Sequence, residues 1–151
     1  QALDLVGRKL AKDGGRAVMA FFKEVQTFVS ERTGDDMLNP YLRPLGLSLD
    51  HLQQATLWLM HNAIGKPDNG GAASYDYMHL FGLVALGYMW CRMVETAMER
   101  LARGAGAAER MKAKLITGRF FVDRMLPETA LRLARIQAGA ESTMGLPDEA
   151  F

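Results

Sequence analysis

The longest apolar stretch of the sequence is Tyr77–Cys91, YMHLFGLVALGYMWC, which is interrupted only by one histidine and two glycines. A membrane span needs about twenty residues, and Asp76 and Arg92 flank this shorter run directly. Strand-like alternation of apolar and polar residues occurs neither in the run nor elsewhere in the sequence. We therefore interpret the run as a helix that is buried on most sides, at the centre of a bundle.

Helical periodicity continues on both sides of this run, and glycines and prolines divide it into segments. The region before Ser48 holds Pro40 and Pro44 and is predicted to be a loop, with Ser48 as the N-cap of the next helix. The turn-rich segment 66–71 is predicted to be a second loop, and a polar tail follows Gly139. The predicted fold is all-α, an up-and-down antiparallel bundle of four to six helices. The helices are expected over residues 1–12, 16–32, 48–65, 74–103, 107–125 and 128–138. The last two form one continuous helix if Pro127 only kinks it.

Gly82, Gly87 and Gly118 fall inside the longer predicted helices 74–103 and 107–125. Each glycine costs a helix about 1 kcal/mol relative to alanine. We therefore expect neighbouring helices to approach closely at these positions; a flat ligand against the same faces is the weaker alternative.

Length and charge limit the class of protein. The 151 residues fit one domain, and 18 basic against 17 acidic residues leave a net charge of +1, without the basic excess that binding of nucleic acid requires. The single cysteine, Cys91, cannot form an internal disulfide, and no secretory signal is present, so the expected location is the cytoplasm. Because the first residue is Gln1 rather than Met, we expect a piece of a longer protein.

Candidate metal ligands are few. The histidines are His51, His61 and His79, and the nearest approach to the Glu-x-x-His motif of di-metal bundles is Asp76-x-x-His79, which occurs once. Such a pair supplies at most two ligands, whereas a catalytic metal needs three from the protein. We expect no metal site; hydrogen-bonded or surface histidines are the interpretation we favour.

Other candidate chemistry is equally weak. Cys91 adjoins Arg92, but neighbours on a helix point in different directions, so a buried inert thiol is expected. The glycine loops 13–16 and 104–106 lack the pattern of a phosphate-binding loop and are interpreted as helix stops. We expect the methionines Met78, Met89, Met111 and Met125 to pack in the core. The carboxylate pairs Asp35-Asp36 and Glu95/Glu99 are expected to be unsuited to acid–base catalysis. No catalytic, cofactor-binding or metal-binding residue is therefore assigned.

Several strings nevertheless resemble a known family. DLVGRKL at residues 4–10 resembles the last helix of the catalytic unit in bacterial long-form acyl-CoA dehydrogenases. YDYMHLFG at residues 75–82 is similar to the signature of the helical domain that these enzymes append after it. RFF at 119–121, RMLPET at 124–129 and AGAES at 138–142 resemble the same domain, in the 3-methylmercaptopropionyl-CoA dehydrogenase-like subgroup.

The resemblance implies a division of the chain and a function. Residues 1–13 would end the last catalytic helix, and residues 14–151 would form the appended C-terminal domain. In the family, FAD oxidises the Cα–Cβ bond of an acyl-CoA, with a glutamate as base. The resemblance implies that this glutamate, the FAD site and the acyl-CoA site lie upstream of Gln1, that the isolated segment is inactive, and that the full-length enzyme is a homo-oligomer.

Three roles follow for the appended domain. The first is docking on the catalytic domains or a partner subunit, or covering the active site, suggested by aromatic residues at segment ends (Trp58, Tyr75, Phe151). The second is ligand binding or membrane contact, which the sequence disfavours because no helix opposes a basic face to an apolar one. The third sets the resemblance aside: a stand-alone helical interaction protein without catalytic activity.

Overall fold

In the computed structural model, which describes residues 1–150, every regular element is helical. Five longer α-helices carry the fold, and short helical turns precede α2, separate α5 from α6 and follow α6. In chain order the elements are α1 (Ala2–Asp4), the π-helical turn η1 (Leu5–Lys9), the 3₁₀ turn η2 (Lys12–Gly15), α2 (Arg16–Ser30), α3 (Asn39–Asn62), α4 (Pro67–Ala102), α5 (Ala108–Phe120), the π-helical turn η3 (Phe121–Met125), α6 (Glu128–Gln137), α7 (Glu141–Met144) and the 3₁₀ turn η4 (Asp148–Ala150).

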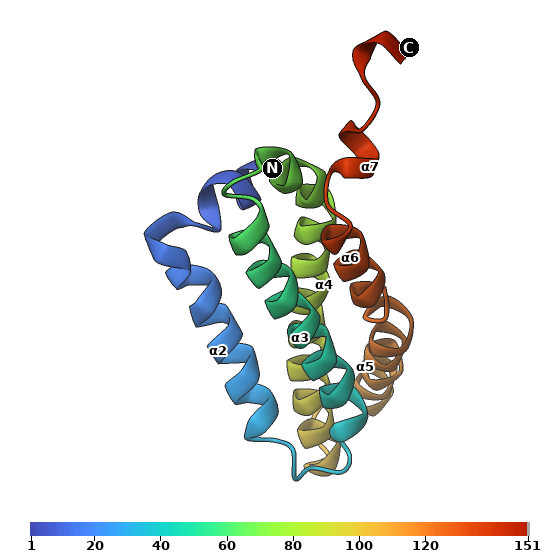
Figure 1. Ribbon diagram of the computed structural model, residues 1–151. Coiled ribbons are helices and arrows are strands. Elements are labelled where there is room, and N and C mark those ends of the chain that lie inside the picture. The colour runs from blue at the N-terminus through green and yellow to red at the C-terminus, as the bar shows by residue number, and fades with distance from the viewer. Residues whose placement is uncertain (151) are drawn as a thin grey trace.

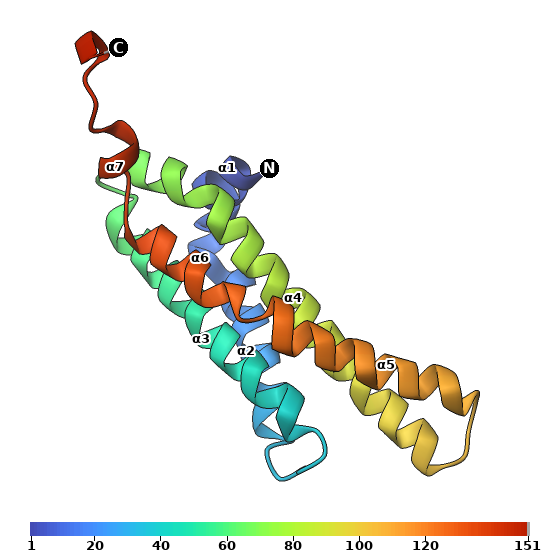
Figure 2. The ribbon, with the colours of Figure 1, turned by 90° about the vertical axis from the view of Figure 1, so that its right-hand side faces the viewer.

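Helices α2, α3 and α4 run down, up and down in turn, and α5 and α6 then both lead back up along α4 (Figure 1). Helix α4 is central, since α3, α5, α6 and the N-terminal turns all pack against it. Figure 2 shows that α5 follows the C-terminal half of α4, while α6 returns along its N-terminal half beside α3. The prediction of an all-α, up-and-down antiparallel bundle is confirmed.

The apolar run of α4 forms the centre of the core. Tyr77, Leu80, Val84 and Cys91 are fully buried, as the sequence predicted for this segment. The phenol of Tyr77 shares a buried 2.8 Å hydrogen bond with the Thr56 hydroxyl of α3. Within the run, Leu86 and Met89 are exposed and the other residues are buried or partly buried.

The prediction of a loop before Ser48 is wrong. Helix α3 begins at Asn39 and passes through Pro44. Pro40 stands in its first turn, where a missing N–H costs nothing because no partner is available there. Ser48 is not an N-cap, since its hydroxyl donates to the Pro44 carbonyl at 2.8 Å inside the helix.

The chain before α3 is folded back by Asp35. Its Oδ1 atom accepts the backbone N–H groups of Met37 at 2.9 Å and Leu38 at 3.1 Å. This side chain satisfies donors that would otherwise be unpaired at the start of a helix. The turn thereby lets α3 begin about two turns earlier than its apolar periodicity indicates.

The predicted loop 66–71 is also wrong. Helix α4 begins at Pro67, a residue whose fixed φ suits the first position of a helix. Gly70 is buried there, and a Cβ atom on it would lie 3.4 Å from the Cβ of Ala63. The start of α4 therefore packs against the end of α3 at Gly70, whereas an added Cβ on Gly71 would meet nothing within 4 Å.

Two of the three helix glycines lie at close contacts. A Cβ atom on Gly118 would lie 2.5 Å from Cγ2 of Val94, and one on Gly87 would lie 2.9 Å from Cδ2 of Leu126. The expectation of close helix approach is confirmed at both. It is wrong at Gly82, where an added Cβ would meet nothing within 4 Å.

The helices predicted over 107–125 and 128–138 are not continuous, because a break separates α5 from α6. The N–H of Leu126 donates to the carbonyl of Phe121 at 3.1 Å, which closes a π-helical turn, and α6 starts directly after Pro127. Proline cannot donate a backbone hydrogen bond, so the helix changes direction at this point. The first predicted helix is similarly made of short turns, and the chain reverses at Asp13–Gly15, where all three φ angles are positive.

One amide side chain joins the ends of three helices. The Nδ2 atom of Asn69 donates to the carbonyl of Asn62 at 3.0 Å, and its Oδ1 atom accepts the N–H of Ala140 at 3.0 Å. Beyond Ala140 the tail, comprising α7 and η4, leads away from the bundle (Figures 1 and 2). Phe151, which the sequence analysis singled out, lies outside the described residues.

Within residues 1–150, no helix combines the length and the apolar character that crossing a membrane requires.

Candidate functional site

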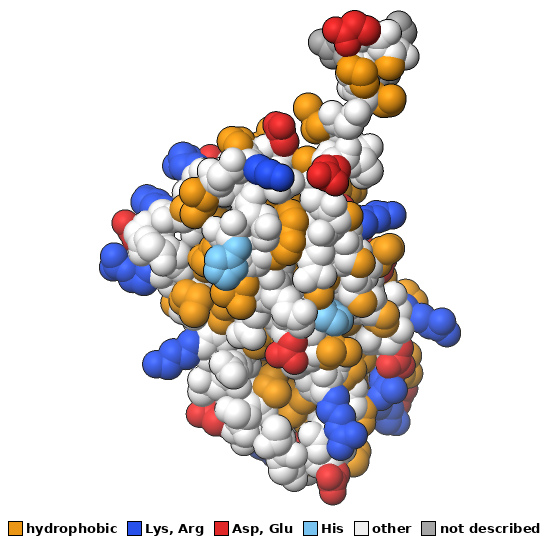
Figure 3. All heavy atoms as spheres, viewed as in Figure 1, with side chains coloured by type: hydrophobic (Ala, Val, Ile, Leu, Met, Phe, Trp, Pro, Cys, Tyr) orange, Lys and Arg blue, Asp and Glu red, His pale blue; other side chains and the backbone are white. Residues whose placement is uncertain are grey.

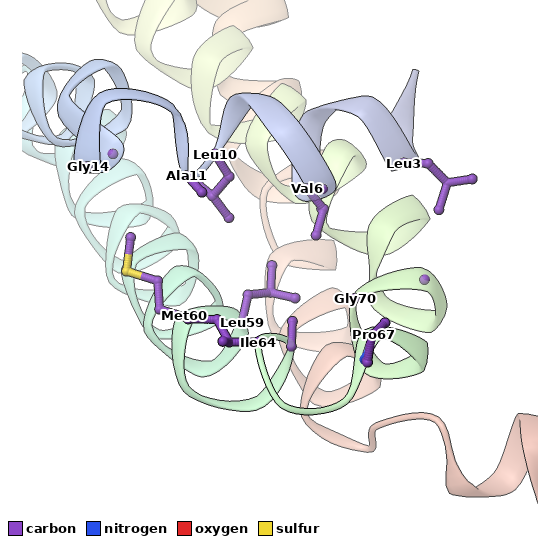
Figure 4. A pocket seen from close by; sticks show the side chains of 14 residues that line it. Leu3, Val6, Leu10, Ala11, Gly14, Leu59, Met60, Ile64, Pro67 and Gly70 are labelled. Atoms are coloured by element: carbon purple, nitrogen blue, oxygen red, sulfur yellow. The ribbon is translucent and has the colours of Figure 1, made fainter.

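An apolar cavity of about 650 Å³ lies where the N-terminal turns cross the end of α3 and the start of α4 (Figure 4). In Figure 4 the side chains of Val6 and Leu10 point from the N-terminal turns toward the helices opposite, whereas Leu3 lies at the far end of these turns and points away from Leu59. The remaining wall consists of small or aliphatic residues: Gly7, Ala11, Gly14, Gly15, Met60, Ala63, Ile64, Pro67, Gly70 and Gly71.

The cavity has a buried floor and an exposed rim. Leu10 and Leu59 are buried at its base. At its mouth, Leu3 is 68% exposed and Ile64 is 85% exposed. Exposed aliphatic side chains around a concave apolar surface indicate a site for binding another apolar group.

The lining determines what this cavity can hold. None of its side chains carries a charge or a hydrogen-bonding group, apart from the weakly accepting sulfur of Met60. It therefore suits hydrocarbon, either an aliphatic chain or the apolar side chains of another protein surface. It does not fit a flavin nucleotide, whose pyrophosphate and ribityl hydroxyls need polar partners.

A second, polar cleft separates α2 from α4. Its residues are already paired: Arg32 Nε lies 2.6 Å from Glu95 Oε1, and the Tyr88 hydroxyl donates to Glu24 at 2.9 Å. The guanidinium of Arg32 also lies 4.1 Å from the ring centroid of Phe28. The Glu95 pairing raises the pKa of Arg32, and burial raises the pKa of Tyr88. These contacts connect α2 and α4 across the cleft, and its glutamates Glu24, Glu31 and Glu95 are paired with Tyr88 or Arg32.

His51 and His61 have different surroundings. His51 Nδ1 lies 2.9 Å from the hydroxyl of Thr129, which itself donates to the Leu126 carbonyl at 2.7 Å. When the Thr129 hydroxyl donates to the Leu126 carbonyl, it can accept a hydrogen bond from the His51 tautomer that carries its proton on Nδ1. Burial lowers the pKa of His51. His61 is exposed.

The Asp76-x-x-His79 pair is divided between other partners. Asp76 accepts from Arg132 at 2.7 Å, with the two side chains only 15% and 14% exposed. The His79 ring lies 4.3 Å from the ring of Tyr75 instead. Among the described residues, no group of three or more potential ligands comes together to hold a metal ion.

Cys91 and the acidic loop residues are engaged in the fold. The Cys91 thiol is buried and donates to the Tyr41 carbonyl at 3.5 Å, and burial raises its pKa to about 12, so it stays protonated at neutral pH. Asp35 accepts the two N–H groups described above, while Asp36 is exposed. Glu99 lies 3.5 Å from Arg103 on the surface.

The glycine loops are helix stops. Gly104 and Gly106 have φ angles of 63° and 89°, and the N–H of Ala105 donates back to the Arg100 carbonyl. Of the methionines expected in the core, Met111 is buried, Met78 and Met125 are partly buried and Met89 is exposed.

Sequence reasoning missed the apolar cavity. Its lining comes from three segments, 3–15, 59–64 and 67–71. The third of these segments was predicted to be a loop rather than the start of a helix that packs against the second. Ile64, an aliphatic residue between a helix end and Gly65, was the available signal. It carried no weight because a single exposed aliphatic residue is common on protein surfaces.

Comparison with known proteins agrees with the sequence resemblance. The chain matches the family model described as acetyl-CoA dehydrogenase C-terminal like, over residues 21–147. It is 28% identical over 152 residues to 3-methylmercaptopropionyl-CoA dehydrogenase of Ruegeria pomeroyi, in an alignment that covers 95% of this chain and 24% of that relative. The chain thus spans about a quarter of the length of the curated relative. Since the family model covers most of the chain, the protein belongs to the family of acyl-CoA dehydrogenase C-terminal domains.

Proposed function

We propose that this chain is the C-terminal accessory domain of a flavin-dependent acyl-CoA dehydrogenase, and that it docks on the catalytic domains through the apolar cavity. Upstream domains of the same polypeptide bind FAD and acyl-CoA and oxidise the Cα–Cβ bond. The family membership and the 24% coverage of the relative support this arrangement. So does the cavity lining, which suits an apolar protein surface better than a cofactor.

The single observation that carries docking is the position of the exposed rim. Leu3, in the N-terminal turns, and Ile64, after the end of α3, both line the cavity and are both exposed. In this proposal residues 1–13 end the last helix of the catalytic unit, and 14–151 form the appended domain. Chain connectivity then holds the cavity beside the catalytic unit, so the docking partner is present at high local concentration.

The partner surface must project aliphatic side chains into the cavity. Removing one leucine or isoleucine side chain from water contributes about 1.5–3 kcal/mol. Burial of Leu3, Ile64 and the cavity wall together would therefore hold the domain firmly. We further propose that the enzyme is a cytoplasmic homo-oligomer.

Flavin content tests the overall assignment. The chain and the longer polypeptide that contains it are purified separately, and flavin absorbance and acyl-CoA oxidation with an artificial electron acceptor are measured for both. The longer protein is expected to be yellow and active, and the chain colourless and inactive. A chain that binds flavin or oxidises substrate would contradict the assignment. A longer protein without either property would favour the alternative of a helical interaction protein.

Association in trans tests docking. The chain is expected to bind the separately expressed catalytic portion in calorimetry. Ile64→Glu places a charge at the mouth of the cavity and should abolish that binding. Ile116→Glu is the matched control, because Ile116 is 72% exposed on α5 and does not line the cavity. Equal binding by the two variants would rule out the cavity as the docking surface.

A further inference from the structure

A groove of about 450 Å³ lies between α4 and α5, near the end of the molecule opposite the tail. Its floor is apolar and consists largely of methionines: Met89, Met93 and Met111, with Ala97 between them. Unbranched thioether side chains adapt to differently shaped partners, which suits a binding surface. We call this feature the methionine groove.

The rim of the methionine groove is basic. Arg92 borders it on one side, and Arg100 and Lys114 border it at the other end; its lining holds no carboxylate. Arg92 stacks over the Tyr88 ring. Neither Arg100 nor Lys114 takes part in an ion pair among residues 1–150. The groove therefore suits an apolar segment flanked by carboxylates.

The tail of this chain has that composition. Met144 is 62% exposed and Leu146 is 66% exposed, so both present apolar surface to solvent. Glu141 precedes them and Glu149 follows them, and both are exposed. Figure 3 shows hydrophobic and acidic side chains on the tail standing clear of the body. Such a segment gains from apolar burial and from pairing with basic residues.

The tail cannot reach the groove of its own chain. It leaves the bundle at Ala140, which is hydrogen-bonded to Asn69 near the start of α4. The nearest groove residue, Met89, lies twenty residues further along that helix, about 30 Å away at the helical rise. Leu146 follows Ala140 by six residues, which span at most about 21 Å when fully extended.

We propose that the tail of one copy of this chain inserts Met144 and Leu146 into the methionine groove of a second copy. The tail glutamates then face the basic rim, so the charges are complementary. Because each copy has one tail and one groove, reciprocal insertion forms a closed two-fold dimer. The proposal does not depend on docking through the apolar cavity, which lies at the other end of α4 and uses other residues.

Charge exchange tests this dimer. Sedimentation equilibrium of the chain is measured for three proteins: the parent chain, a groove variant (R100E/K114E) and a tail variant (E141K/E149K). The parent chain is expected to show a concentration-dependent dimer that salt weakens. Each variant alone should dimerise at least about tenfold more weakly, a loss of about 1.4 kcal/mol. An equimolar mixture of the two should recover a dimer, because an acidic groove then meets a basic tail.

The matched control is R16E/K23E on α2, away from the groove. It changes the net charge by the same four units as the groove variant, from +1 to −3, and should dimerise like the parent chain. A monomeric parent chain at every concentration would overturn the proposal. So would a dimer that both variants retain, or a mixture that recovers nothing while each variant keeps its helical circular dichroism.

Discussion

At the scale of the residue, Gly118 leaves no room for even one methyl group. An added Cβ would lie 2.5 Å from Cγ2 of Val94, a side chain held in the core. We expect Gly118→Ala to lower the free energy of unfolding by about 1–3 kcal/mol, as overpacking does. Gly82→Ala is the control: its Cβ meets nothing, and the better helix propensity of alanine should add up to about 1 kcal/mol. Urea denaturation measures both, and equal shifts would contradict this account.

His51 makes stability depend on acidity. Burial lowers its pKa below the ordinary 6.5, so the folded protein binds a proton there less readily than the unfolded chain. The stabilisation is complete above the unfolded pKa and is lost as the pH falls through the folded one. We expect the free energy of unfolding to fall as the pH drops below the ordinary histidine pKa of about 6.5, and the fall to be shallower in His51→Gln. His61→Gln, at an exposed position, should keep the parent slope.

At the scale of the element, Asp35 sets where α3 begins. Its carboxylate accepts two backbone N–H groups ahead of the helix. We expect Asp35→Ala to lower the free energy of unfolding by about 1 kcal/mol, the net value of such hydrogen bonds. Asp36→Ala, an exposed neighbour, should change it little. Thermal unfolding followed by circular dichroism compares them, and a larger effect at Asp36 would refute the role of Asp35.

Helix interiors could be predicted from the sequence, whereas helix starts could not. The buried residues of α4 follow from the apolar run 77–91, because periodic burial is a local pattern. The starts of α3 and α4 at Asn39 and Pro67 were missed, because prolines and glycines were interpreted as loop residues. Proline in a first helical turn and proline in a loop have the same sequence signature, and only neighbouring contacts distinguish them.

At the scale of the whole molecule, burial of ionisable groups predicts alkaline unfolding. Burial raises the pKa of the Cys91 thiol from 9.0 and that of the Tyr77 phenol from 10.0, each to about 12. The unfolded chain therefore loses these protons first, and stability falls as the pH rises above 9. Each group contributes at most about 1.4 kcal/mol per pH unit. Tyr77→Phe should flatten the fall above pH 10 in urea titrations, whereas Tyr75→Phe, at an exposed position, should not.

The fold and family of the molecule could be predicted from its sequence, but its cavities could not. The apolar cavity depends on whether Leu3, Val6 and Leu59 fill the space between their helices. The sequence pattern around these three residues would be the same if their side chains filled that space and left no cavity. Likewise Gly82 and Gly118 are both helix-interior glycines, and only the crossing of α5 over α4 makes one of them indispensable.

The amide of Asn69 also determines how the protein ages. Asn69 precedes Gly70, and asparagine before glycine is the pairing most prone to lose its side-chain nitrogen over time. The helical backbone of α4 delays that reaction by keeping the Gly70 nitrogen from attacking the side chain. Once an aspartate forms, a negative oxygen faces the Asn62 carbonyl where a donor stood. Old molecules would then loosen at the place where three helices meet and the tail departs.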